Sequence, residues 1–149
     1  MTKRFENKVI LVTGASGEIG QAIAQGFLEG GARIVAADRD AQALSAMVKT
    51  LSEAGHSIVS VPADVTVAAG VEQCIKAAQD TFGRLDAYIN NAGVEGVVAP
   101  IEDYPEAEFD KVMGVNVRGV FLGMKYAVPA LRQSGGGSIV NLASVAGLS

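Results

Sequence analysis

Apolar runs alternate with helix-like segments along the whole chain. Each run is almost continuously apolar and is bounded by turn residues, as expected for a strand buried on both faces of a sheet. The runs cover residues 9–13, 32–37, 57–63, 85–89 and 138–143. Between them, apolar residues recur three and four positions apart, which is the spacing of one face of a helix. Strands that alternate with helices predict βαβ units, a parallel sheet and helices on both of its faces.

The helical segments have recognisable beginnings and apolar faces. The first segment begins near Ile19, and Asp40 and Thr66 are candidate N-caps of the second and third. The fourth segment is long, beginning near Glu106 and ending near Arg132. The predicted apolar face of the first helix consists of Ile19, Ala22, Ile23, Gly26 and Phe27.

A glycine-rich turn separates the first strand from the first helix. The strand ends at Thr13, and glycines follow at Gly14, Gly17 and Gly20. Without a Cβ, glycine tolerates positive φ and lets a ligand approach the main chain, while free N–H groups of the first helical turn point at an anion. Strand, glycine turn and helix start, in this order, predict a cradle for the phosphates of a dinucleotide.

Composition narrows the class of protein. With 149 residues, 49% of them hydrophobic and 19% charged, the chain has the size of one globular domain over residues 1–149, without a linker. The net charge of -4 and the scattered Lys and Arg argue against a nucleic-acid partner. Apolar runs too short for a bilayer, and an N-terminus unlike a signal peptide, predict a cytoplasmic protein with no membrane partner. Nothing beside Cys74 or His56 indicates a metal site or a nucleophile.

Polar residues follow the predicted strands at regular places. Asp38 ends the second strand, Asp64-Val65 follows the third, and residues 90–93 (Asn-Asn-Ala-Gly) follow the fourth; Asn116 lies in the long helix, and residues 137–144 read Gly-Ser-Ile-Val-Asn-Leu-Ala-Ser. Together with the turn over residues 13–20, they resemble the short-chain dehydrogenase/reductase family, which joins a Rossmann fold to hydride transfer with a nicotinamide cofactor. The resemblance implies a doubly wound α/β fold with five parallel strands in the order 3-2-1-4-5. It also implies an oxidoreductase that interconverts an alcohol and a ketone on a small molecule.

The turn departs from the compact branch of that family at Glu18. The compact branch reads Thr-Gly-x-x-x-Gly-x-Gly, whereas Gly14, Gly17 and Gly20 fit the Thr-Gly-x-x-Gly-x-x-Gly spacing of the extended branch. A carboxylate in the first helical turn favours the helix macrodipole but opposes a nearby pyrophosphate, so we expect Glu18 to point away from the phosphates. The spacing leaves an extended-branch nucleotide-sugar epimerase or dehydratase as an alternative function.

Asp38 bears on the choice of cofactor. An acidic side chain near this spacing hydrogen-bonds the ribose hydroxyls of NAD and repels the 2′-phosphate of NADP. Arg39 could hold that phosphate, so NADP stays open as a second choice. By resemblance, Asp64 and Val65 border the adenine, although Asp64 could also cap the next helix, and Asn90 ties strands together. The predicted cofactor-binding residues are Gly14, Ser16, Gly17, Ile19, Gly20, Asp38, Arg39, Asp64, Val65, Asn91, Ala92 and Gly93.

The resemblance also implies catalytic roles. Ser144 matches the serine that hydrogen-bonds the substrate oxygen, and Asn116 matches the asparagine that completes a proton relay through water. The family further uses a tyrosine that exchanges the proton and a lysine four residues later that lowers its pKa. None of Tyr88, Tyr104 and Tyr126 is followed by lysine at that spacing. By resemblance the pair lies beyond Ser144, so we expect the N-terminal part of a longer enzyme, truncated before the sixth strand; the alternative is an NAD-binding module without turnover.

Two surfaces are predicted to lack a cover. In the implied strand order, residues 138–143 form an exposed apolar edge, which favours pairing with another chain. The long helix has a broad apolar stripe, and Gly114, Gly119 and Gly123 favour close packing of another helix. Since this helix commonly helps to form a subunit interface in the family, we expect a homo-oligomer that uses the helix from Glu106 to Arg132.

Overall fold

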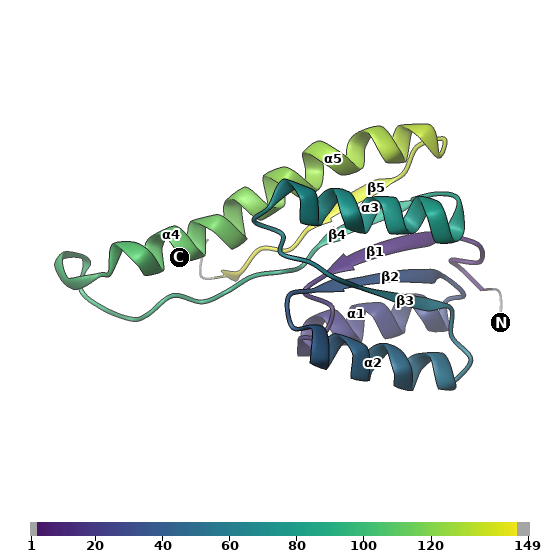
Figure 1. Ribbon diagram of the computed structural model, residues 1–149, viewed down its shortest axis with the longest axis horizontal. Helices are drawn as coiled ribbons and strands as arrows, with labels where there is room; N and C mark the ends of the chain where they lie inside the picture. The colour runs from purple at the N-terminus through teal and green to yellow at the C-terminus, as the bar shows by residue number, and fades with distance from the viewer. Residues whose placement is uncertain (1–2, 146–149) are drawn as a thin grey trace.

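The predicted strands form one parallel sheet in the computed structural model, which describes residues 3–145 (Figure 1). The strand order in this part of the chain is β3-β2-β1-β4-β5, as predicted, and every neighbouring pair is parallel. The carboxyl ends of all the strands therefore meet at one edge of the sheet. The strands are β1 Val9–Thr13, β2 Arg33–Asp38, β3 Ile58–Pro62, β4 Ala87–Asn90 and β5 Ser138–Asn141.

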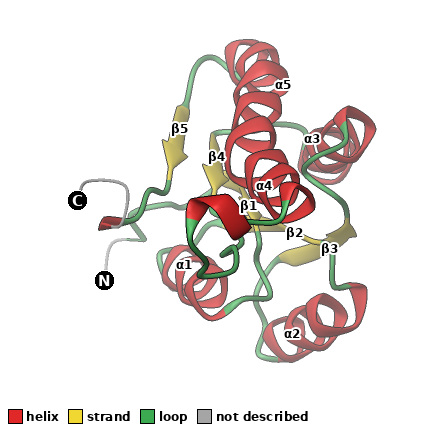
Figure 2. Ribbon diagram, turned by 90° about the vertical axis from the view of Figure 1, so that its left-hand side faces the viewer, coloured by secondary structure: helices red, strands yellow, loops and turns green. Residues whose placement is uncertain are grey.

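Helices cover both faces of the sheet (Figure 2). Alternate residues of β1 belong to two separate cores, with Ile10 in one and Leu11 in the other. All of β1 is buried, which explains its continuous apolar pattern. This arrangement confirms the doubly wound, Rossmann-type α/β fold. The helices are α1 Glu18–Glu29 and α2 Ala41–Glu53 on one face, and α3 Ala68–Phe82 and α5 Val120–Gln133 on the other.

The buried face of α1 agrees only in part with the predicted one: Ile23 and Phe27 pack against the core as expected. Its buried residues are Gly20, Ala24 and Leu28, whereas Ile19, which we expected on the apolar face, is 64% exposed. The turn determines this rotation, because a Cβ on Gly20 would lie only 2.1 Å from Gly14 O. The start of the helix must therefore present its glycine to the turn, and the apolar residue next to it faces outward.

The N-cap predictions have mixed outcomes. Asp40 caps α2 as predicted, since its carboxylate accepts hydrogen bonds from the N–H groups two and three residues later. Thr66 does not cap α3, and neither does Asp64: the N-cap residue is Val67, which forms no side-chain capping bond. The Thr66 N–H and Oγ1 instead donate to Asp64 Oδ1, at 2.8 and 2.7 Å, and close the turn that follows β3.

The predicted long helix consists of three parts. α4 (Glu106–Met113) and α5 are joined by a π-helical segment, η2 (Gly114–Gly119), and a 3-10 turn, η1 (Ile101–Asp103), precedes them. Figure 1 shows that α4 and the loop before it extend beyond the sheet. A π-helical segment inside an α-helix is rare and is frequently found at functional sites.

The glycines of the long helix face the chain itself, so the prediction that they receive another helix is wrong. A Cβ on Gly119 would lie 2.9 Å from Val65 Cγ2, and one on Gly123 would lie 2.4 Å from Asn90 Oδ1. Gly114 likewise faces the turn after β3. These glycines let the helix approach its own sheet closely.

The apolar side chains on the outer side of the long helix remain exposed. β5 is an edge strand that pairs with β4, and its Val140 is 47% exposed. Both predicted uncovered surfaces are therefore present in the described part of the chain. The large apolar residues of the helix that are exposed, by between 36% and 55%, are Phe109, Met113, Val117, Phe121 and Met124.

Candidate functional site

A cleft lies at the carboxyl edge of the sheet, where parallel α/β folds bind ligands. It is formed by the ends of β1, β2 and β3, the loop after β4, and one residue of η2, Val115. Seven of the predicted cofactor-binding residues line it. They are Gly14, Asp38, Arg39, Asp64, Val65, Ala92 and Gly93.

Two of the three glycines in the turn are required by geometry. Gly14 has φ +61°, and a Cβ there would lie 2.8 Å from Ala92 Cα. A Cβ on Gly20 would collide with Gly14 O, whereas one on Gly17 would lie 3.5 Å from that oxygen, an ordinary contact. Both branches of the family have glycine at the two required positions, so the packing of the turn does not distinguish between the branches.

The start of α1 has the features of an anion site. Its N-cap residue is Gly17, which offers no side chain to the free N–H groups of the first turn. Glu18 and Ile19 are both exposed there. The expectation that Glu18 points away from a bound phosphate stays a prediction.

Thr13 and Asn91 join the glycine turn to the loop after β4. The Thr13 hydroxyl donates to Ile89 O and accepts from the N–H groups of Asn91 and Ala92. Asn91 Nδ2 donates to Thr13 O at 2.9 Å and to Gly14 O at 3.1 Å. The side-chain amide of Asn91 therefore holds the main chain at the start of the glycine turn. Thr13 is not among the predicted site residues, although a threonine that ends an otherwise aliphatic strand is a signal that the sequence offers.

Asp38 joins the end of β2 to the glycine turn. Its Oδ2 accepts from the Ser16 N–H at 3.0 Å, and its Oδ1 accepts from the Asp40 N–H at 3.1 Å. No cation within residues 3–145 forms an ion pair with Asp38. The carboxylate lies at the edge of the cleft, with Arg39 beside it.

Asn116 lies in η2 and holds the loop after β4. Its Oδ1 accepts from the Val94 N–H and its Nδ2 donates to Val94 O, both at 2.9 Å. Its predicted part in a proton relay stays a prediction, and these bonds show what its side-chain amide does in this structure. The amide fixes the loop at the point where the loop leaves the cleft.

Ser144 follows the edge strand at the same end of the sheet. Asn90 Nδ2 donates to Asn141 Oδ1 at 2.8 Å, so Asn90 ties β4 to β5 as expected. The Leu142 N–H continues this pairing by donating to Asn90 O. Because β5 runs parallel to β4 and Asn141 pairs with Asn90, the segment after Asn141, which includes Ser144, lies at the carboxyl edge of the sheet.

Two buried side chains with titratable groups lie away from this cleft. Burial raises the pKa of the Cys74 thiol to about 12, and burial also raises the pKa of Tyr88 far above its ordinary value. The Tyr88 hydroxyl has no hydrogen-bond partner in the described part of the chain. Neither group is suited to exchange protons with a substrate at neutral pH.

Two further findings concern metals and membranes. Residues 3–145 contain no group of three or more His, Cys, Asp or Glu side chains that could hold a metal ion. No described helix has the length and apolar character needed to cross a membrane.

The strand order and the glycine turn together define a Rossmann-type fold with the geometry of a dinucleotide cradle. The sequence profile of the family described as short chain dehydrogenase matches residues 8–149. The chain therefore belongs to the short-chain dehydrogenase family.

Relatives agree with this assignment. Levodione reductase of Leifsonia aquatica is 38% identical over 149 residues, covering 99% of this chain and 56% of the relative. 2-(R)-hydroxypropyl-CoM dehydrogenase of Xanthobacter autotrophicus is 41% identical over 145 residues, covering 95% of this chain and 58% of the relative. The crystal structure of an NAD+-bound xylitol dehydrogenase is similar with a TM-score of 0.93 and 37% identity, covering 98% of this chain and 56% of that one. The chain thus spans about half the length of the relatives that it matches.

Proposed function

We propose that the protein containing this chain is an NAD-dependent oxidoreductase that interconverts an alcohol and a ketone on a small molecule. The observation that carries the proposal is the cradle at the carboxyl edge, where Gly14 and Gly20 admit no side chain and Asp38 holds the turn through Ser16. The names of the relatives, which are reductases and dehydrogenases, support the same reaction class.

The residues of the cleft fit a nicotinamide dinucleotide. The backbone of the turn and the uncapped start of α1 would hold the pyrophosphate, and Asp38 would accept hydrogen bonds from the adenosine ribose. Asp64 and Val65 would border the adenine, and Ala92 and Gly93 would line the path toward the nicotinamide. The bound cofactor supplies the hydride acceptor or donor, which no protein side chain provides.

NAD is the preferred cofactor because of the charge at Asp38. A carboxylate that no cation neutralises repels the 2′-phosphate of NADP and accepts bonds from the free hydroxyl of NAD. Arg39 lines the same cleft and is the residue through which NADP would bind. The NAD-bound relative favours the first choice.

The catalytic roles that we propose follow the family. Ser144 would hydrogen-bond the oxygen of the alcohol or ketone, and Asn116 would take part in the proton relay beside the loop that it holds. The tyrosine that exchanges the proton in the family, and the lysine that lowers its pKa, have no counterpart among residues 1–149. A nucleotide-binding module without turnover is therefore the second candidate for the 149-residue chain.

Nucleotide binding and turnover separate these candidates. We expect the 149-residue chain to bind NAD in a calorimetric titration without oxidising a panel of secondary alcohols, and the full polypeptide that contains it to do both. Sustained turnover by a chain of verified mass would overturn the requirement for the tyrosine and lysine. Failure of both forms to bind NAD would overturn the proposed function itself.

The extended-branch alternative rests only on the spacing that includes Gly17, a position at which the packing of the turn does not require glycine. An epimerase or dehydratase of nucleotide sugars would bind UDP-sugars. We expect no UDP-sugar binding under conditions in which NAD binds, and tight binding would restore this alternative.

We also propose a homo-oligomer that uses the outer side of the long helix. Five large apolar side chains there, including Val117 and Phe121, are at least one-third exposed. Exposed apolar patches of this kind mark interaction surfaces. Phe121→Asp should lower the mass measured by light scattering to that of a smaller species, and an unchanged mass would exclude this surface.

A further inference from the structure

The π-helical segment η2 contacts both sides of the cleft. It spans only Gly114–Gly119, yet Asn116 reaches the loop after β4 and three other residues reach the turn after β3. Val115 of the same segment lines the cleft between them. The segment is therefore placed to determine how far apart the two sides lie.

On one side, the contact is a pair of hydrogen bonds. Asn116 accepts from and donates to the main chain of Val94, which lines the cleft. A side-chain amide bonded in both directions to one residue fixes both the distance and the orientation of that residue. The position of the loop after β4 therefore depends on the position of η2.

On the other side, the contact combines packing with one hydrogen bond. Arg118 Nε donates to Thr66 O at 3.2 Å. Gly119 is buried, and a Cβ there would lie 2.9 Å from Val65 Cγ2, closer than real Cβ contacts. Val65 therefore lies directly against the main chain of the helix, and the turn at Asp64 and Thr66 is held by the same helix.

We propose that η2 sets the width of the adenosine end of the cleft, with Arg118 and Gly119 as the positioning residues of the turn that carries Asp64 and Val65. This inference rests on the proposed function, which places the adenosine half of NAD at this turn. The absence of a side chain at Gly119 determines how closely Val65 approaches the helix. Arg118 prevents the turn from moving away.

Two glycine substitutions in η2 provide a matched test. Gly119→Ala places a methyl group against Val65, whereas Gly114→Ala places one 3.6 Å from Thr66 Cγ2, an ordinary contact. Both changes replace a helical glycine by alanine, so their effect on helix propensity is similar. We expect Gly119→Ala to weaken AMP binding by about tenfold, with NMN binding unchanged, and Gly114→Ala to leave both unchanged in calorimetric titrations of the full polypeptide.

Arg118 provides a second test that does not depend on the packing of Gly119. Loss of one hydrogen bond corresponds to a change in affinity of about three- to tenfold. We expect Arg118→Ala to raise the KM for NAD by this factor with kcat unchanged, and to weaken AMP binding equally. Arg118→Lys should restore part of the affinity, because its ammonium group can also donate to Thr66 O.

The outcomes separate the inference from the proposed function. If the unmodified protein binds neither AMP nor NAD, both are wrong. If it binds AMP and the Gly119 and Arg118 variants bind AMP equally well, the inference alone is wrong. Equal losses in Gly114→Ala and Gly119→Ala would also overturn it, because they would reflect the helix in general. Should Gly119→Ala fail to fold, as circular dichroism would show, the Arg118 variants decide the question.

Discussion

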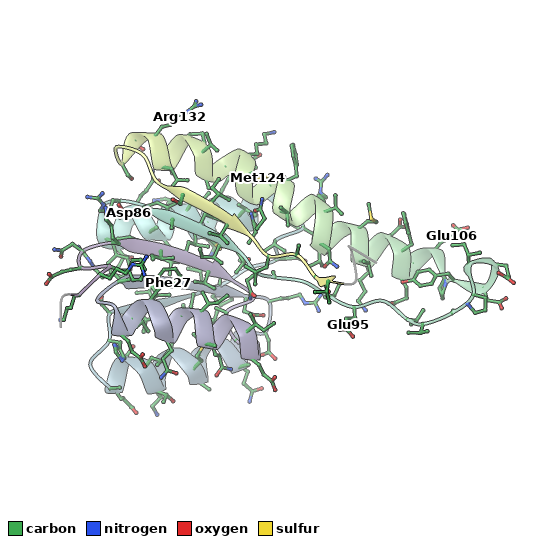
Figure 3. All side chains as sticks on the ribbon, turned by 180° about the vertical axis from the view of Figure 1, so that it is seen from behind. Phe27, Asp86, Glu95, Glu106, Met124 and Arg132 are labelled. Carbon is green, nitrogen blue, oxygen red and sulfur yellow. The ribbon has the colours of Figure 1, made fainter. Side chains whose placement is uncertain are left out.

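The two ends of the sheet both carry half-buried or buried carboxylates, but their partners differ. At the amino end, Asp86 is bonded to the Val9 N–H at 2.9 Å, to Lys8 Nζ at 3.2 Å, and to Arg84 at 2.6 and 2.8 Å. At the carboxyl end, Asp38 is bonded to main-chain N–H groups. Figure 3 shows Asp86 at one end of the strands and Glu95, in the loop beyond β4, at the other.

This difference distinguishes a carboxylate that stabilises the fold from one that is available to a ligand. Two cations neutralise Asp86, so its charge is used within the protein. Neutral N–H donors orient Asp38 without cancelling its charge, which leaves a negative group facing the cleft. A carboxylate oriented by the main chain and unpaired with a cation is thus the stronger candidate for ligand recognition.

Replacing Gly20 should have the largest effect on NAD affinity, because it distorts the glycine turn at the carboxyl end of the sheet and leaves the amino end unchanged. In Gly20→Ala, the new Cβ must move Gly14 O, from which it would otherwise lie 2.1 Å, and so distort the turn. We expect NAD affinity to fall by about 100-fold, measured by calorimetry on protein whose fold is checked by circular dichroism.

Gly17→Ala is the matched control for Gly20→Ala. Its Cβ meets Gly14 O at 3.5 Å, an ordinary contact. The turn should therefore keep its shape, and the loss of NAD affinity should be about tenfold smaller than in Gly20→Ala. Equal losses in the two variants would contradict the assignment of Gly20 as the required glycine.

Replacing Asp86 should destabilise the fold at the amino end of the sheet without changing the cleft. The Asp86 side chain is only 8% exposed and holds the start of β4 to that of β1. Hydrogen bonds to a charged group contribute about 2 kcal/mol, so Asp86→Ala should lower the free energy of unfolding by about that amount, with NAD affinity of the folded protein unchanged. Chemical denaturation measures the first quantity and calorimetry the second.

Asp80→Ala is the control for Asp86→Ala. Asp80 forms an exposed ion pair with Lys76 one helical turn away, and such pairs contribute about 0.5 kcal/mol or less. Equal destabilisation by both substitutions would mean that the contacts of Asp86 contribute no more to the free energy of unfolding than an exposed ion pair does.

Replacing Asp38 should alter cofactor choice by a smaller factor. Asp38→Ala removes the repulsion of a 2′-phosphate, the proposed bond from the ribose hydroxyl of NAD, and the bond from the Ser16 N–H. The last loss affects NAD and NADP alike, so the ratio of their affinities reports the first two, which both concern cofactor choice. We expect the preference for NAD to fall by about tenfold, and an unchanged ratio would refute the role of Asp38 in cofactor choice.

The pH dependence of stability should show the smallest effect and sharpen the comparison further. Burial raises the pKa of Asp86, but the hydrogen bonds from Arg84, the Val9 N–H and Lys8 outweigh it, so the pKa lies below its ordinary value. The stabilisation is therefore full above the unfolded pKa of about 4, and it is lost as the pH falls through the lower folded value. The difference in unfolding free energy between the unmodified protein and Asp86→Ala should therefore shrink as the pH falls from about 5 to about 3. Chemical denaturation of both proteins at several pH values in this range would measure it.

Much of the site was predictable because it depends on residues next to strand ends. Gly14, Asp38, Asp64 and Ala92 each follow or end a predicted strand, and a parallel sheet necessarily collects such residues at one edge. The rotation of α1 was not predictable in the same way. It depends on the contact between Gly20 and Gly14 O, which no periodicity reveals.

The sequence by itself determined the elements, the strand order through its family motifs, and the edge at which the cleft lies, because these follow from local pattern and chain direction. Only the tertiary structure decided that α1 turns Ile19 outward and which partners each polar group has. The glycines of the long helix illustrate the limit: their spacing suggested an external helix, but Gly119 and Gly123 face Val65 and Asn90. Contacts between residues far apart in the chain depend on the packing of whole elements, and a local pattern does not encode them.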